Sequence, residues 1–401
     1  MANIFNDLAP KILAQALTTL RENAVMPRLV NADYSNDAAQ KGSIVQVPVP
    51  SAIAAQDVVP GPYSQSTADM QLDTVPIVLN QWKEAPFQIS EKEMMEISDG
   101  AVSMQVQEAA KAIANAVDRS LLALSTKLYL YAGTAGTTPF ASDLSAFKAA
   151  RTLLNKKNAP LTDRRVLLNS DAEGNAVVLD AFAQALNSGS TETIREGLIG
   201  RKFGFDWYLD QNLDLQSFTA GTFANTTKTT AAPVATTTAD ASSPALHNPR
   251  TVYTVAVDSA GNATTAKAGD VFTVAGDSTT YVVTADVTSA ASGTASAQVA
   301  TISFYPAPAV SWTVGSVLTF KASRATNLIF HRDAFALAVR PLSTGSGVAS
   351  NGTQKMTMVD PITGIPLRLS VREEYMRERW SIDCLWGVAA VRPENAVILA
   401  G

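Results

Sequence analysis

The stretch AVSMQVQEAAKAIANAVDRSLLALSTKLYL, residues 101–130, carries the most regular pattern in the chain. Its apolar residues recur at steps of three and four, a period that predicts one continuous amphipathic helix over 102–130, roughly 40 Å long. The apolar stripe consists of Val102, Val106, Ala109, Ile113, Val117, Leu121, Leu124 and Leu128. Ser90 and Glu93 have the spacing of a capping box, so we expect helical structure to begin near residue 90.

The chain before this helix contains two further patterns. Apolar residues recur every four positions from Ile4 to Leu20, which predicts an amphipathic helix. The start of the sequence lacks the basic lead and continuous apolar run of a signal peptide. Residues 42–88 combine short valine-rich runs with several prolines, which are confined to edge strands and loops. We therefore expect a long two-stranded excursion that is marginal on its own.

The chain directly after the helix alternates helix and strand patterns over residues 142–215. Ser170 and Glu173 have the spacing of a second capping box, and a short apolar strand precedes them at 166–168. Three glycines lead into another strand at 205–209. This region is predicted to be mixed α/β.

Residues 221–300 differ from the rest in composition, being rich in threonine and alanine and poor in charge. A disordered linker and an inserted β domain both fit that composition. Apolar runs separated by DSAGN, AGD and AGDS turns favour strands and hairpins, so we expect a small β barrel over about 247–321. Residues 219–246 are expected to form a flexible lead-in.

Residues 326–401 return to ordinary composition. NLIFHRDAFALAVRPL (327–342) predicts a strand that leads into a helix or turn. LRLSVREEY and RWSIDCLWGVAAVRP predict two long strands.

The composition excludes several classes of protein. The 401 residues carry a formal net charge of −5 and a pI near 5.2, which argues against a protein that grips nucleic acid with its whole surface. One cysteine and two histidines rule out an intramolecular disulfide and a Cys/His zinc site. No apolar run is long enough for a transmembrane helix. We expect a soluble protein made in a reducing cytoplasm.

Motifs for catalysis are missing from the sequence. It contains no GxxxxGK[ST] phosphate loop, no GxGxxG and no GxSxG nucleophile elbow. Cys384 lies in an apolar run and is interpreted as a buried structural thiol. His331 and Asp333 could form half of a catalytic triad, but no serine motif accompanies them. We predict no enzyme, no catalytic residue, no cofactor and no metal.

Three polar groups have both a functional and a structural interpretation. Asp258 and Asn262 resemble part of a calcium loop, although a hairpin turn accounts for them better. The basic residues Lys156, Lys157, Arg164 and Arg165 could contact phosphates, although a solvated helix end is favoured.

The third group is a run of six charges within eight positions. Both a solvated turn and an ion-pair seam between subunits remain open for it. The candidate inter-subunit residues are Arg372, Glu373, Glu374, Arg377, Glu378 and Arg379.

A long helix, an extended arm, a hairpin excursion and a grafted β domain together favour assembly over catalysis, because such arms commonly bury their surface on a neighbour. Four strings in this order resemble the major capsid proteins of tailed double-stranded-DNA bacteriophages. They are REGLIGRKFGFDWYLDQNL (195–213), KAGDVFTVAG (267–276), NLIFHRDAFALAVRPL (327–342) and CLWGVAAVRPENAVIL (384–399). The nearest resemblance is to the phage P-twenty-two coat-protein branch, whose subunit carries an inserted domain.

The resemblance implies an α+β chain with the Hong Kong 97-type phage capsid fold and an inserted β-barrel domain. Its implied parts are listed in chain order: an N-arm (1–30), an E-loop region (31–89), the P-domain spine helix (90–130), an A-domain (131–215), an inserted I-domain (216–323) and the remainder of the A- and P-domains (324–401).

The resemblance also implies function and partners. The chain is expected to self-assemble into pentamers and hexamers of an icosahedral head around non-specifically bound double-stranded DNA. A separate scaffolding protein is expected, portal and decoration proteins are further candidates, and no membrane is involved. The location is the virion, and the host bacterial cytoplasm during assembly. Alternatives are an encapsulin-like compartment shell, a surface adhesin with a β module and, least favoured, a hydrolase.

Overall fold

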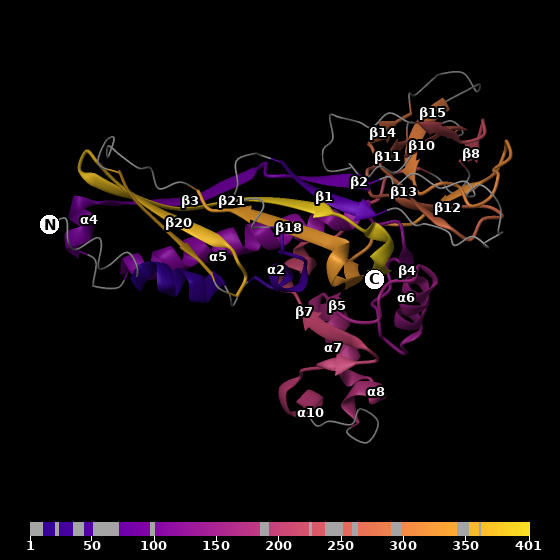
Figure 1. Cartoon of the computed structure of the whole chain (residues 1–401). Coiled ribbons are helices and arrows are strands. Elements are labelled where there is room, and N and C mark those ends of the chain that lie inside the picture. The colour runs from indigo at the N-terminus through magenta and orange to yellow at the C-terminus, as the bar shows by residue number, and fades with distance from the viewer. Residues whose placement is uncertain are drawn as a thin grey trace, which may run out of the picture.

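A computed structural model describes most of the chain. The described residues are 11–20, 24–34, 44–50, 72–96, 101–184, 192–223, 227–236, 252–258, 264–289, 299–342, 353–360 and 362–401. Figure 1 shows an elongated arm of long strands beside a helix, a helical lobe below it and a separate group of strands at the opposite end from the arm's tip.

The helices occupy mainly the first half of the chain. Residues 11–20 are helical, which confirms the predicted N-terminal helix where the structure describes it. The labelled helices are α2 (Met26–Leu29), α4 (Glu91–Glu96), α5 (Ala101–Leu122), α6 (Ser145–Lys156), α7 (Ser170–Val178), α8 (Asp180–Ala183) and α10 (Glu192–Glu196). The 3-10 turns are η1 (Ala123–Lys127), η2 (Gln211–Leu215), η4 (Arg332–Ala334) and η6 (Pro393–Asn395).

The spine helix α5 is shorter than the apolar stripe predicted. After α5 the chain continues as the 3-10 turn η1, and at Leu128 its backbone has the extended conformation. Ser125 and Thr126 explain the change, because short hydroxyl side chains compete for backbone hydrogen bonds and Thr126 Oγ1 bonds the Ala123 carbonyl at 2.9 Å. Leu124 and Leu128 are nevertheless buried, so the stripe correctly predicted which side chains enter the core.

The predicted capping box at Ser90 is confirmed. Glu93 Oε2 accepts from the Ser90 backbone N at 3.0 Å, and Ser90 Oγ accepts from the Glu93 N at 3.3 Å. The second box is wrong: Asn169 is the N-cap of α7 and accepts from Ala172 N at 3.1 Å. Ser170 instead bonds Asp214, which leaves the cap position to its neighbour.

One long antiparallel sheet covers the spine helix. Its order is β18-β21-β20-β19, and β3 pairs with the other edge of β21. The strands are β3 (Gln81–Ser90), β18 (Phe335–Arg340), β19 (Thr353–Val359), β20 (Pro366–Glu374) and β21 (Arg377–Ala390). The two long C-terminal strands were therefore predicted correctly. Alternate β21 residues face α5, and Trp386 Nε1 donates to Ser120 Oγ at 2.9 Å.

A second, mixed sheet forms the helical lobe. Its order is β4-β22-β17-β5-β7-β6, and α6, α7, α8 and α10 lie around it (Figure 1). The strands are β4 (Tyr131–Gly133), β5 (Arg164–Leu168), β6 (Arg201–Lys202), β7 (Phe205–Leu209), β17 (Thr326–His331) and β22 (Ala396–Ala400). Because β17 and β22 are buried along their whole length, this sheet shares one continuous core with the spine helix.

The barrel begins earlier in the chain than expected. Its sheet has the order β16-β12-β13-β15-β10-β8, and a bridge from Lys228 to Val317 brings the two ends together. The strands are β8 (Lys228–Thr229), β9 (Val234–Thr236), β10 (Val252–Asp258), β12 (Val271–Val274), β13 (Thr280–Val283), β15 (Val299–Tyr305) and β16 (Leu318–Phe320), with β11 (Thr265–Ala266) and β14 (Val287–Thr288) paired separately.

The supposed lead-in thus supplies β8 and β9, which are too short to leave a periodic signal in the sequence. Residues 237–251, including His247, lie outside the described residues. The barrel has its own aromatic core, in which Phe304 stacks on Trp312 at 4.9 Å between ring centroids. Phe218 and Arg324 pair antiparallel where the chain enters and leaves the barrel.

The predicted two-stranded excursion is present as β1 (Ile44–Pro50) and β2 (Leu72–Val78), which pair antiparallel. The connecting residues 51–71 lie outside the described residues. The base of this hairpin packs on small side chains of the long sheet, including Ala336, Ala338 and Ala389. The pattern did not reveal that the next strand, β3, joins the long sheet.

Candidate assembly surfaces

The turn between β20 and β21 projects at the end of the arm, opposite the barrel (Figure 1). Tyr375 and Met376 form it and are 88% and 59% exposed. Met376 has a φ of 55°, in the left-handed region. Helix α4 lies beside the turn, since the Glu91 N donates to the Met376 carbonyl at 3.2 Å. The tip therefore offers exposed apolar area on a rigid support.

The six predicted inter-subunit charges all lie on this tip, and their cross-strand register is unusual. Arg372 lies opposite Arg379, and Glu373 lies opposite Glu378, so two of the pairs bring like charges together. Like charges directly opposite each other destabilise a sheet. The register therefore leaves charge that a partner of opposite sign would stabilise.

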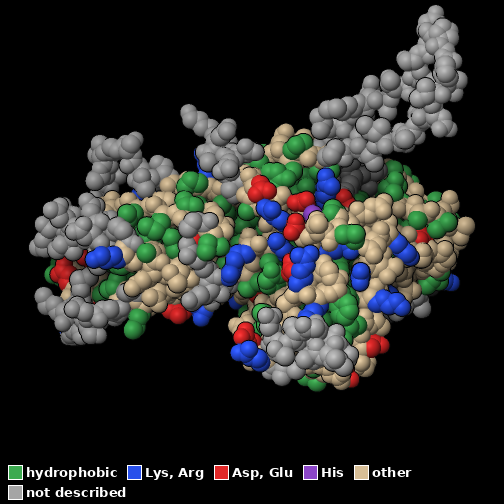
Figure 2. Space-filling view, turned by 60° about the horizontal axis from the view of Figure 1, so that its bottom comes forward, with side chains coloured by type: hydrophobic (Ala, Val, Ile, Leu, Met, Phe, Trp, Pro, Cys, Tyr) green, Lys and Arg blue, Asp and Glu red, His purple; other side chains and the backbone are tan. Residues whose placement is uncertain are grey.

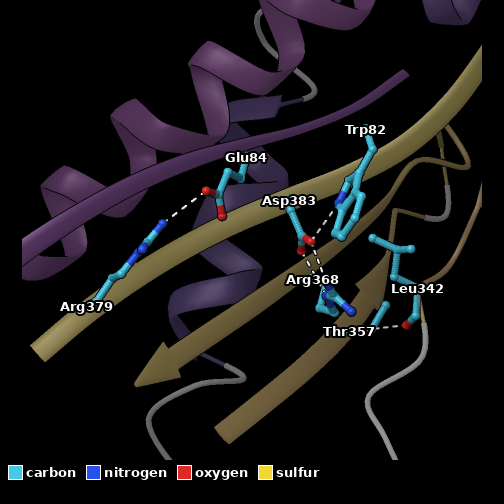
Figure 3. Close-up of polar contacts among 7 residues, drawn as sticks. All are labelled: Trp82, Glu84, Leu342, Thr357, Arg368, Arg379 and Asp383. Carbon is cyan, nitrogen blue, oxygen red and sulfur yellow. Dashed lines mark hydrogen bonds and ion pairs between the residues drawn. The ribbon is translucent and has the colours of Figure 1, made fainter. Parts of the chain in front are cut away.

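Some of the tip charges have partners within the chain. Glu374 and Arg377 form an ion pair at 2.6 Å. Arg379 of β21 forms an ion pair with Glu84 of β3 at 3.0 Å (Figure 3). Glu378 accepts a hydrogen bond from the Trp380 ring nitrogen at 3.2 Å.

The two faces of the tip differ in sign. Strand alternation places Arg372 and Arg379 on the face that points away from the spine helix. Glu373 and Glu378 lie on the other face, where they line a hollow of about 260 Å³ together with Glu91, Glu374 and Arg377. Because four carboxylates surround one arginine there, we call this the anionic face of the tip, and the face with Arg372 and Arg379 the cationic face.

Next to the tip, an ion pair and a hydrogen bond to the same aspartate join β20, β21 and β3 on the outward face of the long sheet (Figure 3). Arg368 Nε donates to Asp383 Oδ1 at 2.9 Å, and Arg368 Nη2 bonds the second carboxylate oxygen. Trp82, which is 64% exposed, donates from Nε1 to Asp383 Oδ2 at 3.0 Å. The sequence analysis missed this group, because Arg368 and Asp383 are 15 positions apart and nothing near either residue indicates that they pair.

The segment that precedes the hairpin excursion is clamped to the turn between β17 and β18. Asn31 Nδ2 donates to Asp333 Oδ1 at 3.1 Å, and Arg332 pairs with Asp33 at 3.0 Å. Figure 2 shows charged side chains of both signs gathered around a histidine on this face. These bonds fix the start of the excursion relative to the two sheets.

His331 is a structural histidine, as the sequence analysis favoured. It is 5% exposed, and its Nδ1 accepts from the Asp333 N at 3.2 Å, which caps η4. Burial lowers its pKa, partly opposed by the charge of Asp333. No serine is bonded to this pair among the described residues.

The basic group near residue 160 does not form one phosphate-binding surface. Arg164 is 2% exposed and donates to Asn155 and to the carbonyls of Ala159 and Pro160. Arg165 donates to the Leu29 carbonyl, which ties the lobe to the N-terminal segment. Burial lowers the pKa of both arginines. The structure therefore contradicts the nucleic-acid interpretation for these two residues.

Cys384 is buried against the spine helix and is 1% exposed. Burial, assisted by the charge of Asp383, raises the pKa of its thiol to about 12. We therefore predict that a thiol reagent modifies the native protein only as fast as the protein unfolds. An aromatic disulfide reagent releases a coloured thiolate when it reacts with the cysteine. The rate of absorbance increase, measured with and without denaturant, therefore reports on this single cysteine. Rapid modification of the native protein would contradict its structural role.

The described residues hold no cluster of three or more His, Cys, Asp or Glu that could bind a metal ion. Asn262, from the calcium-loop interpretation, lies outside them. In the same part of the chain, no helix is long and apolar enough to cross a membrane.

Comparison with known proteins gives structural matches. No protein-family model matches the chain, and no curated protein matches its sequence. A chain of Mycobacterium phage Che8 aligns over 94% of this chain and 90% of its own length, with a TM-score of 0.51 and 14% identity. A chain of the cyanophage P-SCSP1u capsid aligns over 93% and 85%, with a TM-score of 0.45 and 12% identity. A chain of the virus-like particle from Pyrococcus furiosus aligns over 97% and 98%, with a TM-score of 0.44 and 8% identity.

The Che8 match extends across the arm, the lobe and the barrel, since it covers nearly the whole chain. Together with the spine helix under a long sheet, it confirms the fold that the sequence strings implied. The chain is an α+β protein with the Hong Kong 97-type fold of tailed-phage capsid proteins.

Proposed function

We propose that this chain is a major capsid protein, a structural protein that self-assembles into the pentamers and hexamers of an icosahedral phage head around double-stranded DNA. The observation that carries the proposal is the fold shared with the Che8 phage chain over 94% of the sequence. The projecting tip and the hairpin excursion support it, because the tip extends away from the main core and the hairpin packs in a separate cluster on the long sheet.

We further propose the division of the chain that the resemblance implied. The parts are an N-arm (1–30), an E-loop region (31–89), a spine-helix region (90–130), an A-domain (131–215), an I-domain (216–323) and the returning A- and P-domain strands (324–401). In this division the tip of β20 and β21 belongs to the P-domain, and the hairpin of β1 and β2 belongs to the E-loop.

The tip suggests how neighbouring copies attach. A cationic face carrying Arg372 and Arg379 can bind the anionic face of another copy, which carries Glu373 and Glu378. Such a head-to-tail contact uses two different surfaces and closes into rings when the rotation fits. Each contact can be weak, because many act together within a closed shell.

The remaining partners follow from this role. A separate scaffolding protein directs assembly, portal and decoration proteins complete the head, and the packaged DNA is bound without sequence preference. The protein acts in the virion after assembly in the host cytoplasm.

Electron microscopy of the purified chain, expressed alone and with its neighbouring reading frames, tests the proposal. Closed shells, or sheets that become uniform shells with a partner, are the expected result. Particles that contain a protein cargo and no DNA would indicate an encapsulin-like compartment. A compact chain that stays unassembled at high concentration with all neighbouring products present would overturn the proposal.

Reversing one tip charge separates assembly from folding. Arg372→Glu replaces a like-charge pair by an ion pair with Arg379, so the folded subunit is expected to gain about 0.5 kcal/mol. The same change removes charge from the cationic face. Losing about 1.4 kcal/mol per contact raises the concentration needed for assembly roughly tenfold.

Light scattering against protein concentration measures that assembly, and urea unfolding measures the subunit. Arg372→Lys is the matched control and keeps both properties near wild type. Normal assembly by Arg372→Glu would show that the tip is only a solvated turn.

A further inference from the structure

Two buried carboxyl groups meet where three segments of the chain come together. Asp118 lies on α5 and is fully buried, and Asp210 precedes η2 and is 2% exposed. The N-terminal segment reaches the same point through α2. Neither residue takes part in the surfaces described above.

Asp118 links the three segments directly. Its Oδ1 accepts from the Met26 backbone N of α2 at 2.8 Å. Its Oδ2 accepts from Asn212 Nδ2 at 2.9 Å. The N-terminal segment and the lobe are therefore both bonded to one carboxyl group of the spine helix.

Asp210 also forms hydrogen bonds within the protein, but one of its two carboxylate oxygens receives none. Its Oδ1 accepts from the Asn212 N at 2.9 Å, and its own N donates to the Leu168 carbonyl at 3.0 Å. Its Oδ2 is buried without a donor from the protein. Asp118 and Asp210 are close enough for each to influence the other, and two carboxyl groups can share a hydrogen bond only when one of them carries a proton.

Among the described residues, no cation contributes to the pKa of Asp118. From α5, Arg119 directs Nε to the Asn212 side chain at 3.3 Å. From α2, Arg28 directs Nε to the Ala24 carbonyl at 3.0 Å. Within η2, Asp214 Oδ1 accepts a hydrogen bond from the Ser170 backbone N. Asp210 is thus the ionisable group that faces Asp118 from the packed elements.

Burial is the main cause that raises the pKa of Asp118, and the charge of Asp210 and the hydrogen bond to it add to the effect. Together they raise that pKa to about 8, against 3.8 for an exposed aspartate. Two like charges at a desolvated site cannot both ionise easily, which is the behaviour of paired carboxylates.

We propose that Asp118 carries a proton at neutral pH, donates it in a hydrogen bond to the unpaired oxygen of Asp210, and so forms a pH-sensitive joint that fastens the N-terminal segment and the lobe to the spine helix. The proton completes the bond to the otherwise unpaired Asp210 oxygen. Its loss leaves two adjacent buried charges, and their repulsion destabilises the packing of α2 and the lobe on the spine helix.

The sign of the pH effect follows from proton binding. Native Asp118 keeps its proton up to a pH near 8, whereas the unfolded chain loses it near pH 4. Unfolding between these values releases one proton, so this pair makes the unfolding constant rise about tenfold per pH unit. The stabilising contribution is thus largest at acid pH, falls as pH rises and changes no further above the native pKa.

The test compares the full unassembled chain with Asp118→Asn and Asp210→Asn. Asp118→Asn keeps a donor toward Asp210 but has no titrating proton. The unfolding constant in urea, measured between pH 5 and 7, is expected to rise about tenfold less per pH unit in Asp118→Asn than in wild type. Asp210→Asn is expected to keep part of the wild-type slope, because burial still raises the pKa of Asp118. Because the comparison is a difference, other titrating groups cancel. An identical slope in wild type and in folded Asp118→Asn would overturn the proposal.

Two local measurements address the joint itself and do not depend on global unfolding. The infrared carbonyl band of a buried protonated carboxylic acid is expected in wild type at pH 7 and is expected to be absent from Asp118→Asn. Hydrogen exchange of the segment 24–30, corrected for intrinsic rates, is expected to accelerate about tenfold per pH unit above roughly pH 8 in wild type only.

The buried strand β17 is the control segment for exchange, and its protection is expected to be the same in both proteins. Absence of the carbonyl band in wild type at pH 7 would overturn the shared proton. Equal exchange of residues 24–30 in wild type and Asp118→Asn across the whole range would overturn the joint.

Discussion

Replacing Asp383 by alanine is expected to lower the free energy of unfolding of the subunit by about 3–5 kcal/mol, because it removes the carboxylate that pairs with a largely buried arginine. The side chains of Arg368 and Asp383 are 13% and 5% exposed, so water replaces the lost carboxylate poorly. The change also removes the acceptor of the Trp82 ring nitrogen. This one substitution thus removes the side-chain hydrogen bonds and the ion pair that join β3, β21 and β20 on the outward face.

Two further variants identify the cause. Asp383→Asn keeps an oxygen acceptor and the side-chain volume, so it is expected to lose less stability than Asp383→Ala. A double replacement, Arg368→Leu with Asp383→Leu, removes both charges and is expected to be more stable than either single alanine variant. Urea unfolding of unassembled subunits measures all of them. An Asp383→Ala subunit within 0.5 kcal/mol of wild type would contradict the assignment.

Local patterns in the sequence predicted the elements that local chemistry determines. The stripe from Val102 to Leu128 identified the spine helix, since one face of it enters the core. Ser90 and Glu93 identified the start of α4, because a capping box is complete within four residues. Alternating apolar residues identified β20 and β21 for the same reason.

Features that depend on distant partners could not be predicted in this way. Asp118 and Asp210 are 92 positions apart, and nothing near either residue indicates that they meet. Strands β8 and β9 have two and three residues, so their pairing with β10 depends on the barrel that surrounds them. The six tip charges were found from their density, but their like-charge register required the hairpin geometry.

Gly387→Ala is expected to displace the hairpin excursion from the long sheet. A β carbon at Gly387 would lie 2.3 Å from the Val78 carbonyl oxygen and 2.8 Å from its carbon, and both are backbone atoms that no rotamer change can move. The backbone at Gly387 is outside the left-handed region, so close approach alone requires glycine here. The chain passes over β21 at this point, between the end of β2 and the start of β3.

The expected loss of stability is about 1–3 kcal/mol, the usual effect of overpacking. The larger effect is expected in assembly, because the hairpin leaves its seat on Ala336, Ala338 and Ala389 while the rest of the subunit stays folded. Under the proposed function, the displaced E-loop no longer reaches the neighbouring copy in the correct place. Shell yield by electron microscopy should fall far more than subunit stability.

Gly174→Ala is the matched control for this substitution. Gly174 lies within α7, and a β carbon there has no atom within 4 Å. Alanine is the better helix former, so this variant is expected to gain about 0.5–1 kcal/mol and to assemble normally. Normal shells from Gly387→Ala would show that the hairpin's seat on the sheet does not guide assembly. Shells lost in both variants would point to a general sensitivity of assembly to glycine replacement. Loss in Gly387→Ala alone ties assembly to the position of the excursion, since the two changes add the same methyl group.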